Sequence, residues 1–291
     1  MSMIRKVTPI ALAIAALVTA GPVFAQTGAA TATAVSGQVS TGNSYTEDDS
    51  TNNASLNNTV LQHASGNIGV NNAAGNGNSQ GNALSVAVVS NHNGATANAG
   101  SLQIGVGSTA TSKEDNTNNA SINNKVLEDA SGNVAVNNAA GDGNQQANDL
   151  SIAVNSKEHS GLADADTLGI QALNSNFVAP DNSGATHNNA SLSNDVLENA
   201  SGNVTANNAA GFNNQQSNSG AIAVSDNGLA HAFAGGLQIS AGGNYAAGDS
   251  VTNNASVSNE VLQNASGNVS VNNTAGAGNQ QMNSMSIAVS Q

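Results

Sequence analysis

Residues 118–154 read NNASINNKVLEDASGNVAVNNAAGDGNQQANDLSIAV, and this stretch decides the fold because the chain repeats it. Gap-free copies of the same pattern occupy 52–88, 118–154, 188–224 and 253–289. The alternative for such an Asn-rich sequence is disorder. Disorder does not require copies of equal length, so the matched copies argue against it. The repeat therefore indicates an ordered array of similar units.

Hydrophobic residues in each copy alternate with small or polar residues. Val134 and Val136 are two positions apart, and so are Ile152 and Val154. This period is typical of β-strands, and the Gly and Asn residues between the alternating runs are typical of turns. We predict an all-β, repeat-based cross-β or β-solenoid-like stack with about three short strands per repeat and layers about 4.8 Å apart. These four residues are expected in the strand core.

The amide side chains also fall at matched positions. The columns that are Asn in all four copies include those of Asn52, Asn53, Asn67, Asn71, Asn72, Asn78 and Asn82. When identical segments stack in register, a side-chain amide can bond to the amide one layer above or below it. The expected ladder residues are Asn71, Asn137, Asn207 and Asn272 in one column, and Gln146, Gln216 and Gln281 in another.

The repeats divide the chain into nine segments. We expect a signal peptide at 1–25, because Arg5 and Lys6 precede an apolar run that ends in the cleavage signature Val23-Phe24-Ala25. The remaining segments are an N-terminal segment (26–51), repeat 1 (52–88), linker 1 (89–117), repeat 2 (118–154), linker 2 (155–187), repeat 3 (188–224), linker 3 (225–252) and repeat 4 (253–289). The signal peptide predicts a secreted protein, located outside the cell or on its surface.

The linkers share a related apolar triplet. It reads Leu102-Gln103-Ile104, Leu168-Gly169-Ile170 and Leu237-Gln238-Ile239 in the three linkers. The linkers either form partial layers through these triplets or extend as loops, and the pattern fits both.

Composition argues against several classes of function. The chain has 5 basic and 18 acidic residues, so a nucleic-acid partner is not expected. It has no Cys, and its five His residues share no repeat column and lack metal-ligand spacing. No His–acid pair recurs beside a candidate nucleophile, so a catalytic site is not indicated. We therefore expect no catalytic, cofactor-binding or metal-binding residues.

The repeat resembles those of the functional amyloid (Fap) fibre subunits of pseudomonads and related bacteria. The resemblance is carried by 130–148, ASGNVAVNNAAGDGNQQAN, and by the closing LSIAV of 150–154. It implies self-assembly into fibres that support biofilm matrix and surface attachment, nucleation on a minor subunit, and export through an outer-membrane pore. The chain has four repeats where the family pattern has three, and it lacks a C-terminal Cys-x-x-Cys.

A monomeric β-solenoid adhesin or surface-layer protein is the main alternative. It would share the signal peptide, the alternating strands and the repeats. Such a protein needs capping elements at both ends of its stack, because open strand edges recruit further chains. Neither 26–51 nor the last residues, 287–291, provides a convincing cap.

Replacing Asn71, Asn137, Asn207 and Asn272 together by Asp should block or greatly delay assembly. The change places four like charges in one column at layer spacing, where they repel one another. Assembly kinetics followed by thioflavin fluorescence measure the effect. A variant that assembles as the parent does would contradict in-register stacking.

Overall fold

The computed structural model describes residues 29–47, 49–90, 94–112, 115–156, 161–178, 184–241, 245–246 and 250–291. All regular elements of this part of the chain are β-strands. No helix in it is long and apolar enough to span a bilayer. The predicted signal peptide lies outside the described residues.

Each repeat contributes one strand to each of three parallel sheets. Sheet 1 contains β3 (Ser50–Asn57), β7 (Asn116–Asn123), β11 (Thr186–Ser193) and β16 (Val251–Ser258). Sheet 2 contains β4 (Ser65–Ala74), β8 (Ser131–Ala140), β12 (Ser201–Phe212) and β17 (Ser266–Ala277). Sheet 3 contains β5 (Ser79–Val89), β9 (Gln145–Asn155), β13 (Gln215–Ser225) and β18 (Gln280–Ser290).

A fourth parallel sheet, the linker sheet, comes from the segments between the repeats. Its main strands are β1 (Ala30–Thr41), β6 (Ala95–Ser112), β10 (Leu162–Val178) and β14 (Leu229–Ser240). The short strands β2 (Ser44–Glu47) and β15 (Tyr245–Ala246) extend it by pairing with β6 and β10. The N-terminal segment therefore supplies the linker strand of the first layer.

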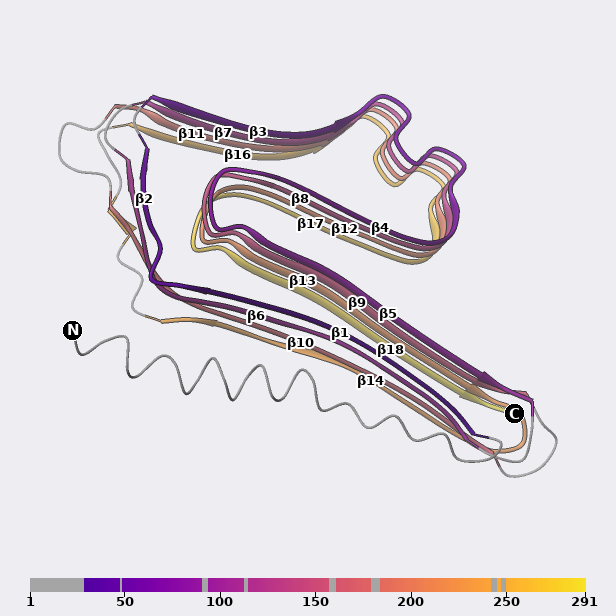
Figure 1. Cartoon of the computed structure of the whole chain (residues 1–291). Coiled ribbons are helices and arrows are strands. Elements are labelled where there is room, and N and C mark those ends of the chain that lie inside the picture. The colour runs from indigo at the N-terminus through magenta and orange to yellow at the C-terminus, as the bar shows by residue number, and fades with distance from the viewer. Residues whose placement is uncertain are drawn as a thin grey trace, which may run out of the picture.

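The chain passes once through all four sheets in each layer, and four layers lie on top of one another (Figure 1). The first layer contains β1 to β5, the second β6 to β9, the third β10 to β13 and the last β14 to β18. Sheet 2 lies between sheets 1 and 3, and the linker sheet packs on the other face of sheet 3. Every sheet therefore runs along the stacking axis.

Neighbouring layers pair residue by residue. Asn118 pairs with Asn188 in sheet 1, and equal repeat lengths carry the same register into sheets 2 and 3. Among the described strand pairs, the register shifts only between Asn174 and Ser175 of β10, where it faces β6. Because a slip by one residue would turn every side chain to the opposite face, this register keeps each residue type in a single column.

Apolar clusters lie between sheets 1 and 2 and between sheet 3 and the linker sheet. Between sheets 1 and 2, Ile122, Val134 and Val136 pack with their counterparts from the other layers. Between sheet 3 and the linker sheet, the core consists mainly of Ala side chains, such as Ala153 and Ala165. Small side chains let these two sheets approach closely, so polar groups in the same interface are also removed from water.

The predicted all-β repeat stack is confirmed, but each layer passes through four sheets, so it has four main strands and not about three. The fourth is the linker strand, which apolar periodicity within the repeat does not reveal. The alignment of the linker triplets is also corrected, because Leu102 and Leu237 pair with Ile170 and not with Leu168. The matched triplet of linker 2 is thus Ile170-Gln171-Ala172, two residues later than expected.

Candidate assembly site: the stacked amide columns

The first expected ladder column lies between sheets 2 and 3. Each Asn donates from Nδ2 to Oδ1 of the Asn one layer earlier: Asn137 to Asn71, Asn207 to Asn137 and Asn272 to Asn207, each over 3.0 Å. Asn137 and Asn207 are fully buried. An amide removed from water is costly unless it is hydrogen-bonded, so each layer depends on its neighbours.

A second Asn column faces the first one across the interface between the sheets. Asn148 of β9 donates to Asn137 Oδ1 over 2.8 Å, and Asn207 of β12 donates to Asn148 Oδ1 over 3.0 Å. Asn218 of β13 in turn donates to both Asn148 and Asn207 over 2.9 Å. These bonds join sheet 2 to sheet 3 as well as one layer to the next.

The Gln column runs along sheet 3 and also links the two sheets. Gln146 Nε2 donates to Gln216 Oε1 over 2.8 Å, and Gln216 Nε2 donates to Gln281 Oε1 over 3.0 Å. The same nitrogen of Gln146 donates to the backbone oxygen of Asn138 over 2.9 Å. Gln80 of the first layer starts this column by donating to Gln146 over 2.8 Å.

The linker sheet contains a further Gln column, which was not predicted from the sequence. Gln171 Nε2 donates to Gln103 Oε1 over 2.8 Å and to the backbone oxygen of Gln216 over 2.9 Å. Gln238 donates to Gln171 over 2.8 Å, and Gln103 donates to Gln38 over 3.3 Å. A signal was present in the sequence, because Ala alternates with other residues ahead of each of these Gln residues, as in 30–34, 95–99 and 230–234.

The amide columns have a direction. In the Asn137 column the later layer donates to the earlier one. The column therefore ends in the Nδ2 donor of Asn71 on one side and in the Oδ1 acceptor of Asn272 on the other. In the Gln146 column the earlier layer donates to the later one. The first-layer face and the last-layer face of the stack are therefore different and complementary.

The residues predicted as strand core fall in two environments. Val134 and Val136 are buried in the apolar cluster between sheets 1 and 2. Ile152 and Val154 lie in β9 and are partly exposed, while their neighbour Ala153 is buried against the linker sheet. The four predicted core residues therefore do not belong to one apolar cluster.

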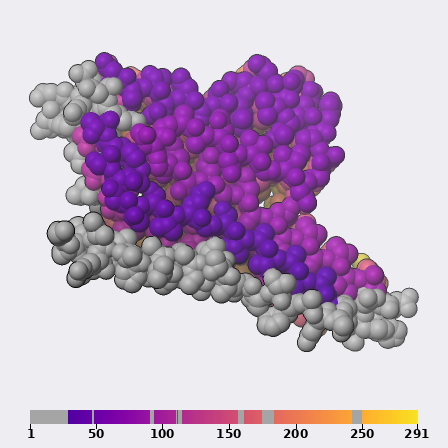
Figure 2. Space-filling model, in the orientation of Figure 1, coloured from indigo at the N-terminus to yellow at the C-terminus, as the bar shows by residue number. Residues whose placement is uncertain are grey.

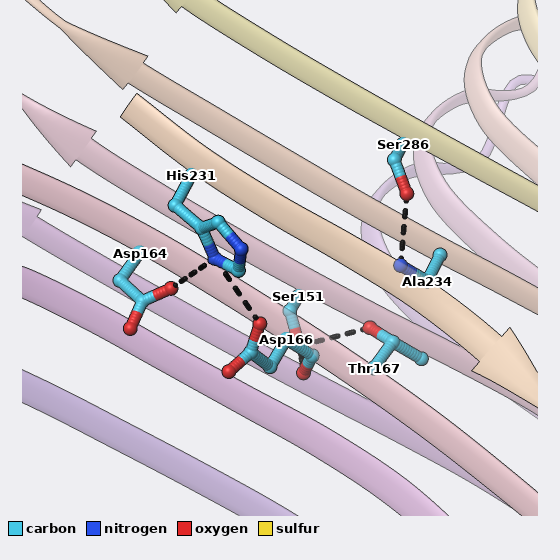
Figure 3. A network of polar contacts seen from close by, with 7 residues as sticks. All are labelled: Ser151, Asp164, Asp166, Thr167, His231, Ala234 and Ser286. Atoms are coloured by element: carbon cyan, nitrogen blue, oxygen red, sulfur yellow. Dashed lines mark hydrogen bonds and ion pairs between the residues drawn. The ribbon is translucent and has the colours of Figure 1, made fainter. Parts of the chain in front are cut away.

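One histidine lies beside two carboxylates on the outer face of the linker sheet (Figure 3). His231 Nδ1 is 2.8 Å from Asp164 Oδ1 and 3.6 Å from Asp166 Oδ1. The hydrogen bond to Asp164 raises the pKa of His231, so this pair adds a pH-dependent ion pair between the third and last layers. Of the other histidines, His92 and His159 lie outside the described residues.

Comparisons with known proteins agree with the repeat architecture. The model of the functional amyloid protein FapB/FapC family matches residues 11–155 and 164–291. The functional amyloid subunit FapC of Pseudomonas aeruginosa is 35% identical over 325 aligned positions, which cover 97% of this chain and 94% of that protein. No solved structure matches the chain.

Replacing Gln171 by Glu should destabilise the folded stack by about 3–5 kcal/mol at neutral pH, because a buried carboxylate would replace the donor and face two acceptor oxygens. The cost should fall at low pH, where the new carboxyl group is protonated. The denaturant concentration at half-unfolding measures this effect. Gln291→Glu, at the exposed last residue, is the matched control and should leave stability unchanged; equal stability of the two variants would contradict a structural role for the linker column.

Proposed function

The chain belongs to the functional amyloid protein FapB/FapC family, whose members are structural and not enzymatic, and we propose that its fibre grows by end-to-end stacking of four-layer chains. In this arrangement the last layer of one chain lies on the first layer of the next. Each chain adds about 19 Å to the fibre, four layers at about 4.8 Å each.

The first support for this proposal is the open ends of the sheets. Strands β3, β4 and β5 form the edge of sheets 1 to 3 on one side, and β16, β17 and β18 form it on the other. Figure 2 shows the face formed largely by the first layer, with its indigo and purple atoms toward the viewer. An edge strand presents unpaired backbone groups that can pair with another chain.

The second support is the match between the two end faces. Stacking would bring Asn71 Nδ2 to Asn272 Oδ1, and Gln281 Nε2 to Gln80 Oε1, so both amide columns would continue across the junction with the direction that they have within the chain. A contact between two different faces cannot close a symmetric dimer, and when it is repeated along the stacking axis it generates an open filament. A second copy of this chain therefore fits each end.

The glycines at the start of sheet 2 give the third support. A Cβ at Gly132 would lie 2.7 Å from Gly66 O, and one at Gly202 would lie 2.6 Å from Gly132 O. All three glycines have φ between +97° and +99°. At Gly66, in the first layer, a Cβ would meet nothing within 4 Å. Only a second chain, through its Gly267, would bring a carbonyl oxygen close to Gly66.

We further propose that the fibre forms outside the cell, where it supports the biofilm matrix and surface attachment. Export through an outer-membrane pore and nucleation on a minor subunit belong to the same proposal. They are supported by the family membership and by the signal-peptide pattern of 1–25.

The variants Gly66→Ala and Gly132→Ala test whether the chains stack end to end or remain monomeric β-solenoids. Both variants carry the same backbone strain, because the two φ values are nearly equal. In a stacked fibre both also place a methyl group against a carbonyl oxygen of the next layer, so we expect both to abolish assembly or lengthen its lag severalfold. Thioflavin fluorescence and fibre diffraction of the 26–291 protein measure assembly.

The parent protein should give seeded sigmoidal growth and reflections near 4.7 and 10 Å. A Gly66→Ala protein that assembles far better than Gly132→Ala would contradict end-to-end stacking. A parent protein that stays monomeric and β-rich would favour the β-solenoid adhesin.

A further inference from the structure

Asp149 is a buried acidic residue in the middle of the stack. It lies on β9 of sheet 3, faces the linker sheet, and is only 4% exposed. In the other layers the same position of the strand ladder holds Ala83, Ser219 and Ser284. The carboxyl group thus occurs in one layer of four, and the column does not need it in order to pack.

The surroundings of Asp149 do not neutralise its charge. Ser101 Oγ donates to Asp149 Oδ2 over 2.7 Å, while Oδ1 is buried without a hydrogen-bond partner. Gly169 of β10 makes room for the carboxyl group, because a Cβ there would lie 3.2 Å from Oδ2 and 3.0 Å from Ser217 Oγ.

The groups that face Asp149 from the packed strands are hydroxyls, methyl groups and backbone. They are Ser101 of β6, Gly169 of β10, Ser217 and Ser219 of β13, and Ala83 of β5. Three titratable residues of the linker sheet alternate with buried residues and lie on its outer face: Asp164, Asp166 and His231. Among the described residues that face it, none carries a charge.

An ionised carboxylate that is hydrogen-bonded by Ser101 alone, with one oxygen left without a partner, is unstable in such a place. Burial raises the pKa of the Asp149 carboxyl from 3.8 to about 7, and hydrogen bonds from the side chain and the backbone of Ser101 only partly oppose this increase. Both the geometry and the raised pKa therefore favour the neutral, protonated form of Asp149 in the folded layer.

We infer that Asp149 is a proton-binding site of the core, so that closing sheet 3 onto the linker sheet takes up a proton from solution. The inference rests on the layered fold, and its fibre test rests also on the proposed function. The folded carboxyl binds its proton more tightly than the unfolded one, so this residue makes the stack most stable below about pH 4. That stability is lost as the pH rises toward 7 and does not change further above it.

The test compares the parent with Asp149→Ser, which introduces the residue that the third and last layers already carry. Denaturant is used to dissociate fibres of each protein into unfolded monomers between pH 5 and pH 8. The dissociation constant of the parent should rise by roughly a hundredfold over this range through Asp149 alone. Asp149→Ser should lose that increase and be the more stable protein at pH 8. Asp226→Ser, in the turn before β14, is the control and should behave as the parent does.

A second readout is the carboxyl ¹³C shift of Asp149 in assembled protein, assigned by its loss in Asp149→Ser. It should titrate near pH 7. A titration near pH 4, or an unchanged pH dependence in Asp149→Ser, would overturn the inference. If no fibres form at any pH, the proposed function fails, and the same titration on folded monomers still decides the role of Asp149.

Discussion

The structure depends on one requirement: a buried side-chain amide needs another amide at the same height in the next layer. Asn137 and Asn207 have no contact with water, and their hydrogen bonds come from neighbouring layers and from the facing sheet. This requirement fixes the register, because a slip by one residue would leave every column unsatisfied at once. It also explains why the repeats have equal lengths although their linkers differ.

The same requirement accounts for an unusual composition. Aromatic residues make up 2% of the chain and Trp is absent, so large side chains contribute little to the core. Between sheet 3 and the linker sheet, Ala columns bring the sheets close together, and Gln columns bind across the gap to backbone oxygens. Hydrogen-bonded amides thus occupy places that aliphatic and aromatic side chains occupy in most globular proteins.

Sequence reasoning found the repeat strands because two signals agree there: the alternation at Val134 and Val136, and the matched Asn columns. It misaligned linker 2 because it compared apolar residues. In the linker sheet, Leu168 lies half exposed on the outer face and pairs with Gly100 and Gly235, while Gln171 faces the core. The burial of Asp149 was also beyond the sequence, because it depends on which face of β9 meets the linker sheet and on the space above Gly169.

The layer-to-layer spacing along the chain has a consequence for how such proteins change over generations. Equivalent amides are separated by 66, 70 and 65 residues, yet all of them keep the same partners. A duplication or deletion of one complete repeat with its linker would therefore lengthen or shorten the coil by one turn and leave every remaining column intact. An insertion of one residue inside a unit would instead shift the register of every residue after it and turn those side chains to the opposite face.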